Sequence, residues 1–116
     1  MADRHEVESF LNELKTKINI FGIVYLDDRK KNAQTLFSLE ISPIRRTEFI
    51  QELKAEDYSS GPIDEKMRGF SDMWVFGITV KSVEIYVKIC LGLTNISAVC
   101  ISFHIAEHPL NYPLKK

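Results

Sequence analysis

Two stretches near the end of the chain carry side chains whose types and spacing suit acid–base chemistry. Residues 82–91 and 96–105 alternate between apolar and polar residues, which predicts two β-strands that each have one face on the core. Their apolar faces consist of Val83, Ile85, Val87, Ile89 and Leu91, and of Val99, Ile101, Phe103 and Ile105. Their polar faces consist of Glu84, Tyr86, Lys88 and Cys90, and of Ala98, Cys100, Ser102 and His104.

The pairing of these two strands decides which polar side chains meet. Residues directly opposite each other in an antiparallel pair share a face. One register places Tyr86 opposite Ser102 and Glu84 opposite His104. The other register places Tyr86 opposite His104 and Lys88 opposite Ser102. In both registers Tyr86 and His104 lie within one pairing step of each other on the same face.

A face that holds a phenol, an imidazole, an ammonium group and a carboxylate suits the cleavage of RNA without a metal ion. Histidine exchanges a proton near neutral pH, and cations stabilise the charge that develops on a phosphorane. In such a reaction a base takes the proton of the 2′-hydroxyl, and an acid protonates the 5′-oxygen that leaves. Polar residues are also expected on the solvent face of a sheet without catalytic function. Glu84 and Lys88 would then form only a weak surface pair.

The same part of the sequence also contains a motif that is known from metal sites. The run from His104 to His108 has the HxxEH pattern of a zinc-peptidase family. That motif requires a helix, whereas His104 ends a predicted strand and Pro109 follows His108. Cys90 and Cys100 have no CxxC spacing, and the glycines have no phosphate-loop spacing. We therefore expect no metal and no cofactor.

The first part of the chain predicts helices. Residues 3–18 have apolar residues at helical spacing, and Asp3 with Glu6 forms a capping-box pattern. Residues 20–26 predict a short strand, for which an edge and an interior position in the sheet are both open. Residues 32–40 predict a second helix, with Leu36 and Leu39 buried.

A third helix is expected from Ser42-Pro43 to about Lys54, because serine caps helices and proline suits the first turn. Its predicted apolar face consists of Phe49, Ile50 and Leu53. Residues 55–71 predict an irregular loop, because Ser-Gly-Pro and Gly69 interrupt the pattern. Residues 72–80 predict the first of three consecutive strands.

These elements predict an α+β fold in which N-terminal helices pack on a mainly antiparallel sheet that ends in a three-stranded meander. The length of 116 residues suits a single domain over 1–116. No apolar run is long enough to cross a membrane, and the polar N-terminus is unlike a signal peptide, so a cytoplasmic location is expected. With a net charge of −1, a nucleic-acid ligand would need a local basic patch. The run Arg29-Lys30-Lys31 is typical of a solvated loop and only secondarily of such a patch.

Short motifs between about residues 50 and 105 resemble the MqsR family of mRNA interferase toxins. These motifs are Asp57-Tyr58, Trp74, the run Glu84-Ile-Tyr-Val-Lys-Ile89 and the run Ile101-Ser-Phe-His104. The order of helices, irregular loop and meander is similar to the RelE-like fold of that family.

The resemblance implies a catalytic set. The catalytic tyrosine of the family falls on Tyr86. Its catalytic lysine in the last strand falls on His104, which replaces a cation by a group that can also act as base or acid. Lys88 joins these two from the same predicted face. The glutamine that follows the tryptophan in the family falls on Val75, which cannot form the same hydrogen bonds.

The resemblance also implies a set of substrate-binding residues. The lysine that follows the Asp-Tyr-like pair of the family has no match in Ser59-Ser60. The loop around this position offers other cations that could replace it. The expected substrate-binding residues are therefore Lys54, Lys66, Arg68 and Trp74.

The activity implied is that of a toxin of a toxin–antitoxin system. Such a metal-independent endoribonuclease would cleave mRNA, free or on the ribosome, and arrest growth. Its implied partner is a cognate antitoxin protein that carries a DNA-binding domain, and no membrane partner is expected. The alternative is a non-catalytic protein-interaction module on a RelE-like scaffold, which Val75 and the absence of a basic excess favour.

Overall fold

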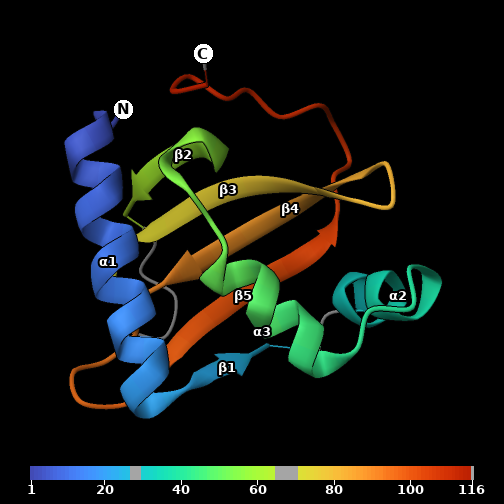
Figure 1. Ribbon diagram of the computed structural model, residues 1–116, viewed down its shortest axis with the longest axis horizontal. Helices are drawn as coiled ribbons and strands as arrows, with labels where there is room; N and C mark the ends of the chain where they lie inside the picture. Colours follow the sequence, from blue (N-terminus) through green and yellow to red (C-terminus); the bar gives the residue numbers. More distant parts are fainter. Residues whose placement is uncertain (27–29, 65–70, 116) are drawn as a thin grey trace.

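The computed structural model describes residues 1–26, 30–64 and 71–115. These residues form the expected α+β fold, with three α-helices and a five-stranded mixed sheet (Figure 1). The helices are α1 (Arg4–Phe21), α2 (Lys30–Ser38) and α3 (Pro43–Gln51), with a short 3₁₀ turn at Ala55–Asp57. The strands are β1 (Ile23–Tyr25), β2 (Tyr58–Ile63), β3 (Met73–Val80), β4 (Val83–Cys90) and β5 (Ala98–Ile105). Within these ranges no helix has the length and apolar character that crossing a bilayer requires.

The sheet has the strand order β1-β5-β4-β3-β2. The meander of β3, β4 and β5 is confirmed, with antiparallel pairing throughout. β1 pairs with β5 in parallel and lies at one edge. β2 occupies the other edge, where the sequence predicted only a loop. Its Ser-Gly-Pro segment is tolerated there because an edge strand lacks a partner on one side, and its pairing with β3 shifts register twice.

α1 is the predicted amphipathic helix. Asp3 caps it by accepting a hydrogen bond from the Glu6 amide, and the Glu6 side chain completes the capping box. The five apolar residues that define its spacing are all buried: Val7, Phe10, Leu11, Leu14 and Ile18. The helix continues to Phe21 before Gly22 ends it with φ 81°. β1 is therefore shorter than the predicted strand over 20–26.

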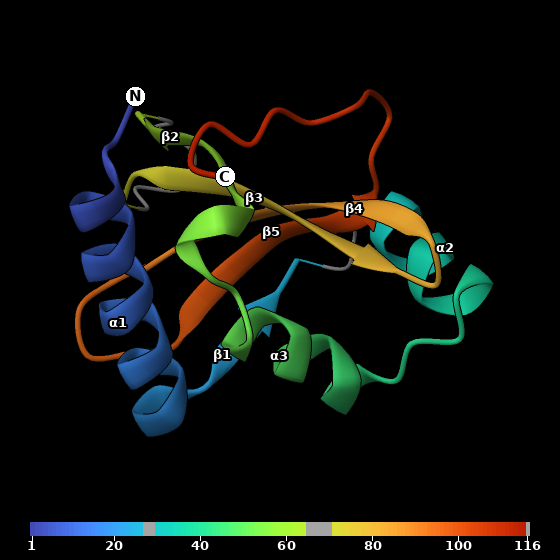
Figure 2. The same ribbon diagram turned by 45° about the horizontal axis from the view of Figure 1, so that its top comes forward.

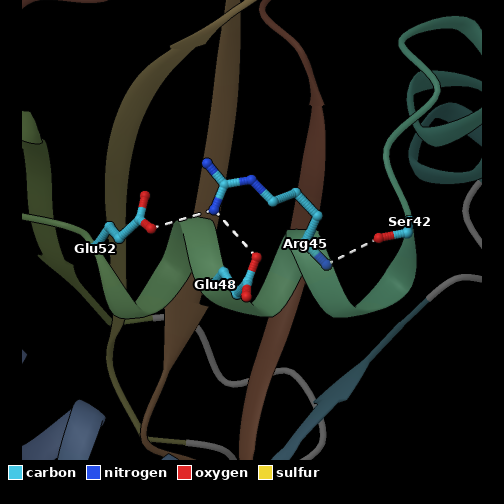
Figure 3. Close-up of polar contacts among 4 residues, drawn as sticks. All are labelled: Ser42, Arg45, Glu48 and Glu52. Atoms are coloured by element: carbon cyan, nitrogen blue, oxygen red, sulfur yellow. Dashed lines mark hydrogen bonds and ion pairs between the residues drawn. The ribbon is translucent and has the colours of Figure 1, made fainter.

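α3 lies with α1 on the same face of the sheet, which is the face that holds the main core (Figures 1 and 2). Ser42 caps it through a hydrogen bond from the Arg45 amide (Figure 3). Ile50 and Leu53 are fully buried as predicted, and Phe49 is partly buried. On the outer face Arg45 contacts both Glu48 and Glu52 at 3.2 Å. These exposed pairs give α3 a solvated outer surface.

α2 covers the outer edge of β5 beyond the short β1. Asn32 accepts a hydrogen bond from the Phe103 amide at 3.0 Å and donates one to the Ile101 carbonyl at 3.2 Å. The Thr35 hydroxyl accepts one from the Ile105 amide at 2.9 Å. Two polar side chains thus replace the missing strand and leave the edge protected.

This role explains an error in the predicted burial of α2. Leu36 and Leu39 are only partly buried against the core, while Asn32 and Thr35 are buried. Helical periodicity ranks apolar residues first, and it gives no signal for a polar side chain that is buried because it binds a strand edge.

β5 contains a bulge that breaks the predicted alternation. Lys88 lies opposite Ser102, but the next residue of β4, Ile89, lies opposite Cys100, so Ile101 is the extra residue. In residues 98–100, on the N-terminal side of the bulge, each side chain of β5 therefore lies on the face opposite to the predicted one. Cys100 packs in the main core, and Ile101 joins a second cluster with Met73, Cys90 and Val99 on the other face.

Candidate functional site

Tyr86 and His104 lie opposite each other in neighbouring strands, which is the second of the two predicted registers. Their rings stack with a centroid distance of 5.2 Å and an interplanar angle of 17°. His104 is only 9% exposed. Its Nδ1 lies 2.9 Å from the carbonyl oxygen of Ile105. Since a carbonyl can only accept, Nδ1 carries a hydrogen, and in the neutral ring the lone pair is on Nε2.

These two residues line a pocket of about 570 Å³ between β4, β5, α2 and the segment that follows β5. The other lining residues are Lys30, Lys31, Lys88, Ser102, Glu107, His108, Pro109 and Leu110. Among the described residues that line it, three lysines and two histidines accompany one carboxylate, so this part of the lining is rich in basic side chains although the chain is not. Such a site suits an anionic ligand, for which phosphate is the common biological group.

Glu107, the carboxylate among the described lining residues, is paired. Lys31 Nζ lies 2.7 Å from Glu107 Oε2, and this contact links α2 to the bend after β5. The Lys31 ammonium group holds the pKa of Glu107 below its usual range. Both side chains are more than half exposed, so an incoming anion competes with Glu107 for Lys31 in solvent.

The C-terminal segment, residues 106–115, forms one wall of the pocket. After β5 it turns back over the sheet, on the side away from α3 (Figure 2). Glu84 anchors it by accepting hydrogen bonds from the Leu110 amide at 3.2 Å and from the Tyr112 hydroxyl at 2.5 Å. Burial, followed by the hydrogen bond to Glu84, raises the pKa of Tyr112. Arg4 of α1 holds the end of the segment through the Leu114 carbonyl.

A glycine makes this close approach possible. Gly77 lies opposite Tyr86 in β3, under the C-terminal segment. A Cβ at this position would overlap the Tyr112 hydroxyl and lie 2.7 Å from Leu110 Cδ1. Gly77, Tyr86 and His104 thus form one cross-strand row, with the C-terminal segment over its first member and the pocket over the other two.

The predicted catalytic residues come together, whereas Lys54 and Trp74, the two predicted substrate-binding residues that the structure describes, lie away from them. Tyr86, His104 and Lys88 line one pocket. Trp74 lies on the opposite face of the sheet, where it stacks on Phe10 of α1 with a centroid distance of 4.4 Å. Lys54 begins the 3₁₀ turn after α3 and does not line the pocket. Lys66 and Arg68 lie outside the described residues. Val75 lies opposite Lys88 and is 2% exposed.

Several pocket residues were missed by sequence reasoning. Lys30 and Lys31 belong to α2, which begins two residues before the predicted start and so carries them to the pocket rather than into a loop. The sequence placed Ser102 on the polar face without a role, and it offered His108 only as part of the HxxEH pattern. The signal for His108 was its position just after a strand whose polar face bears His104.

The remaining groups that could do chemistry are elsewhere. Cys90 and Cys100 are buried thiols, and burial raises the pKa of Cys90. His104 belongs to β5 and Glu107 and His108 to the bend after it, so the HxxEH pattern is not helical. In the described part of the chain, no group of three or more histidine, cysteine, aspartate or glutamate side chains is arranged to hold a metal ion.

The chain was compared with protein-family models, with curated proteins and with solved structures, and no match was found in any of the three comparisons.

Proposed function

We propose that the pocket at Tyr86 and His104 cleaves RNA, and that the chain acts as a growth-arresting endoribonuclease toxin similar to the MqsR family, on a RelE-like fold. The observation that carries this proposal is the stacked Tyr86–His104 pair in a pocket that also holds Lys30, Lys31 and Lys88. A titratable imidazole beside clustered cations is the combination that phosphodiester transfer within RNA needs.

In the proposed reaction His104 Nε2 takes the proton of a 2′-hydroxyl. The 2′-oxygen attacks the adjacent phosphorus, forming the 2′-O–P bond as the P–O5′ bond breaks. Lys88 stabilises the negative charge on the phosphorane oxygens, and the Tyr86 hydroxyl donates a hydrogen bond to the reacting phosphate. His108, as imidazolium, gives its proton to the departing 5′-oxygen. The products carry a 2′,3′-cyclic phosphate and a 5′-hydroxyl.

Inducible expression in bacterial cells tests the proposal, with growth and primer-extension mapping of mRNA ends as readouts. The wild type should arrest growth and create new ends, and His104→Ala should lower cleavage by about 10²-fold or more, as expected for loss of a general base. His5→Ala is the matched control, because His5 is exposed and lines a different pocket.

Purified protein then identifies the chemistry of the ends. RNA incubated with and without ribosomes should yield 2′,3′-cyclic phosphate and 5′-hydroxyl ends. His104→Gln, which keeps a polar side chain in a buried position, guards against an unfolded alanine variant. Cleavage by both His104 variants at the wild-type rate would refute the role assigned to His104. Absence of cleavage by the wild type, with and without ribosomes, would refute the proposed nuclease activity.

A second candidate is a non-catalytic module that binds a protein partner on the same scaffold. It is favoured by Val75, which is buried where the similar family has a glutamine. It is also favoured by β1, an edge strand of three residues in which Val24 is 48% exposed. An exposed strand edge can pair with a partner's strand. The double variant Tyr86→Phe, His104→Ala separates the two candidates. A nuclease loses growth inhibition and keeps its antitoxin complex, whereas a binding module loses complex formation or shows no growth inhibition to begin with.

A further inference from the structure

Ser102 is a buried polar residue inside the pocket that the proposed reaction leaves without a role. It is 2% exposed, lies opposite Lys88 in the β4–β5 pair and precedes His104 by two residues. Regular alternation places it on the face of His104, and the register shift begins only at the preceding residue, Ile101. Ser102 therefore lies in the pocket between the Lys88 ammonium group and the His104 imidazole.

The surroundings of the Ser102 hydroxyl indicate a ligand. Although Ser102 is only 2% exposed as a residue, its hydroxyl oxygen is not sealed in the core and can be reached from the pocket. Among residues 1–26, 30–64 and 71–115 the hydroxyl of Ser102 makes no hydrogen bond; only its backbone carbonyl accepts one beyond the strand ladder, from Cys100 Sγ at 3.3 Å. The open side of the hydroxyl is the pocket itself.

The chemistry of the pocket specifies an anion with strong acceptor oxygens. A serine hydroxyl donates one hydrogen, and phosphoryl oxygens accept such hydrogens in short, charge-assisted bonds. Lys88 on one side and Lys30 and Lys31 across the pocket supply the compensating charge. A cationic ligand would be repelled by these ammonium groups, and a neutral ligand would gain nothing from their charge.

We propose that Ser102 is a substrate-contacting residue of this pocket, whose hydroxyl donates to a non-bridging oxygen of a nucleic-acid phosphate, and that Lys30 neutralises the same or the adjacent phosphate. This inference rests on the proposed function, because it takes the ligand to be the phosphodiester that His104 acts on. It adds a ground-state binding group to a site whose other assigned residues act on protons and developing charge.

Binding of a single-stranded oligodeoxynucleotide tests the inference, because DNA lacks the 2′-hydroxyl and is not cleaved. Fluorescence anisotropy at low salt should show saturable binding to the full chain, with inorganic phosphate as a competitor. Ser102→Ala should weaken the affinity about tenfold, which corresponds to about 1.4 kcal/mol. Lys30→Gln should weaken it and lower the salt dependence by close to one counterion.

Matched controls come from the same chain. Ser9→Ala removes a serine of α1 that lines a different pocket, and Lys81→Gln removes a lysine in the β3–β4 turn that binds the Leu39 carbonyl. Both should bind the oligonucleotide as the wild type does. Ser102→Thr keeps the hydroxyl and suits a strand, so it should restore most of the affinity. It also decides the matter if circular dichroism shows that the alanine variant is unfolded.

The outcomes separate this inference from the proposed function. If Ser102→Ala and Ser9→Ala bind equally well, or if the wild type binds neither oligonucleotide nor phosphate, the role of Ser102 is overturned. If the two serine variants bind equally well but RNA is still cleaved to cyclic phosphate ends, the proposed nuclease activity is supported and only the role of Ser102 is rejected. If Ser102→Ala loses affinity but the wild type cleaves no RNA, the anion-binding site is supported and the proposed nuclease activity is rejected.

Discussion

The contact between Tyr112 and Glu84 gives the most direct test of how the pocket wall is held. Tyr112→Phe removes one hydroxyl and leaves the ring in place over Gly77. The lost hydrogen bond to Glu84 is 2.5 Å long and partly buried. A hydrogen bond to a charged group contributes about 1.5–3 kcal/mol. Because the site is only partly buried, we expect a loss at the lower end, about 1.5 kcal/mol.

Two measurements follow the loss. The unfolding free energy from urea titration should fall by about 1.5 kcal/mol, with a decrease in Tm of about 6 °C for a chain of this length. Amide hydrogen exchange of Leu110 should accelerate, because Glu84 also binds this amide and both bonds hold the same segment. The amides of α1 should exchange more slowly than that of Leu110, because they open only with the core.

A double-mutant cycle with Glu84→Gln isolates the pair. The combined variant should be less destabilised than the sum of the two single variants. Gly77→Ala provides the steric counterpart, since its Cβ would overlap the Tyr112 hydroxyl and displace the segment. Adding Tyr112→Phe to Gly77→Ala should recover part of the unfolding free energy that Gly77→Ala loses, because it removes the overlapping hydroxyl. Unchanged Leu110 exchange and a change in unfolding free energy below about 0.3 kcal/mol in Tyr112→Phe would refute the clamp.

Three further predictions concern the edge, the ion pair and the core. Asn32→Ala should destabilise the fold by about 3 kcal/mol in urea titration, because it leaves the buried Phe103 amide and Ile101 carbonyl without their partner. The same variant uncovers the edge of β5, so size-exclusion chromatography should show association of the chain. Glu107→Gln should tighten oligonucleotide binding at neutral pH by less than about tenfold, because it releases an exposed Lys31. Since the folded pKa of Glu107 is lowered, its ion pair is present above the ordinary carboxyl pKa and is lost as the pH falls through the lowered value, so the advantage of Glu107→Gln should disappear there. Leu14→Ala should cost about 2–5 kcal/mol of unfolding free energy in urea titration, because Leu14 is fully buried in the main core, whereas the control Ile44→Ala removes an exposed side chain and should change little.

The elements that the sequence predicted well are those in which local pattern and tertiary packing agree. α1 carries its apolar residues at helical spacing and its capping box in adjacent positions, so both its face and its start were correct. The start of α3 at Ser42-Pro43 followed from the same kind of local signal. The meander followed from period-two alternation, and parity limited the pairing of Tyr86 to two registers, one of which is present.

The errors have physical causes that lie outside any local window. Asn32 and Thr35 are buried because β1 is too short to cover β5, a fact about strand length at a distant position. The bulge at Ile101 shifts the faces of β5 by one residue, and a single extra residue has no signature in an alternating apolar run. Trp74 was expected at the site because of a motif, yet its strand parity places it on the face of Phe10.

The sequence by itself determined the fold class, the faces of α1 and α3, and the set of polar side chains on β4 and the end of β5, because these depend on residue spacing along one element. Only the tertiary structure decided that Lys30, Lys31 and His108 join Tyr86 and His104 in one pocket, and that Glu84 anchors the pocket wall rather than facing the ligand. These contacts join residues far apart in the chain, and their geometry depends on how the sheet, α2 and the C-terminal segment pack against one another.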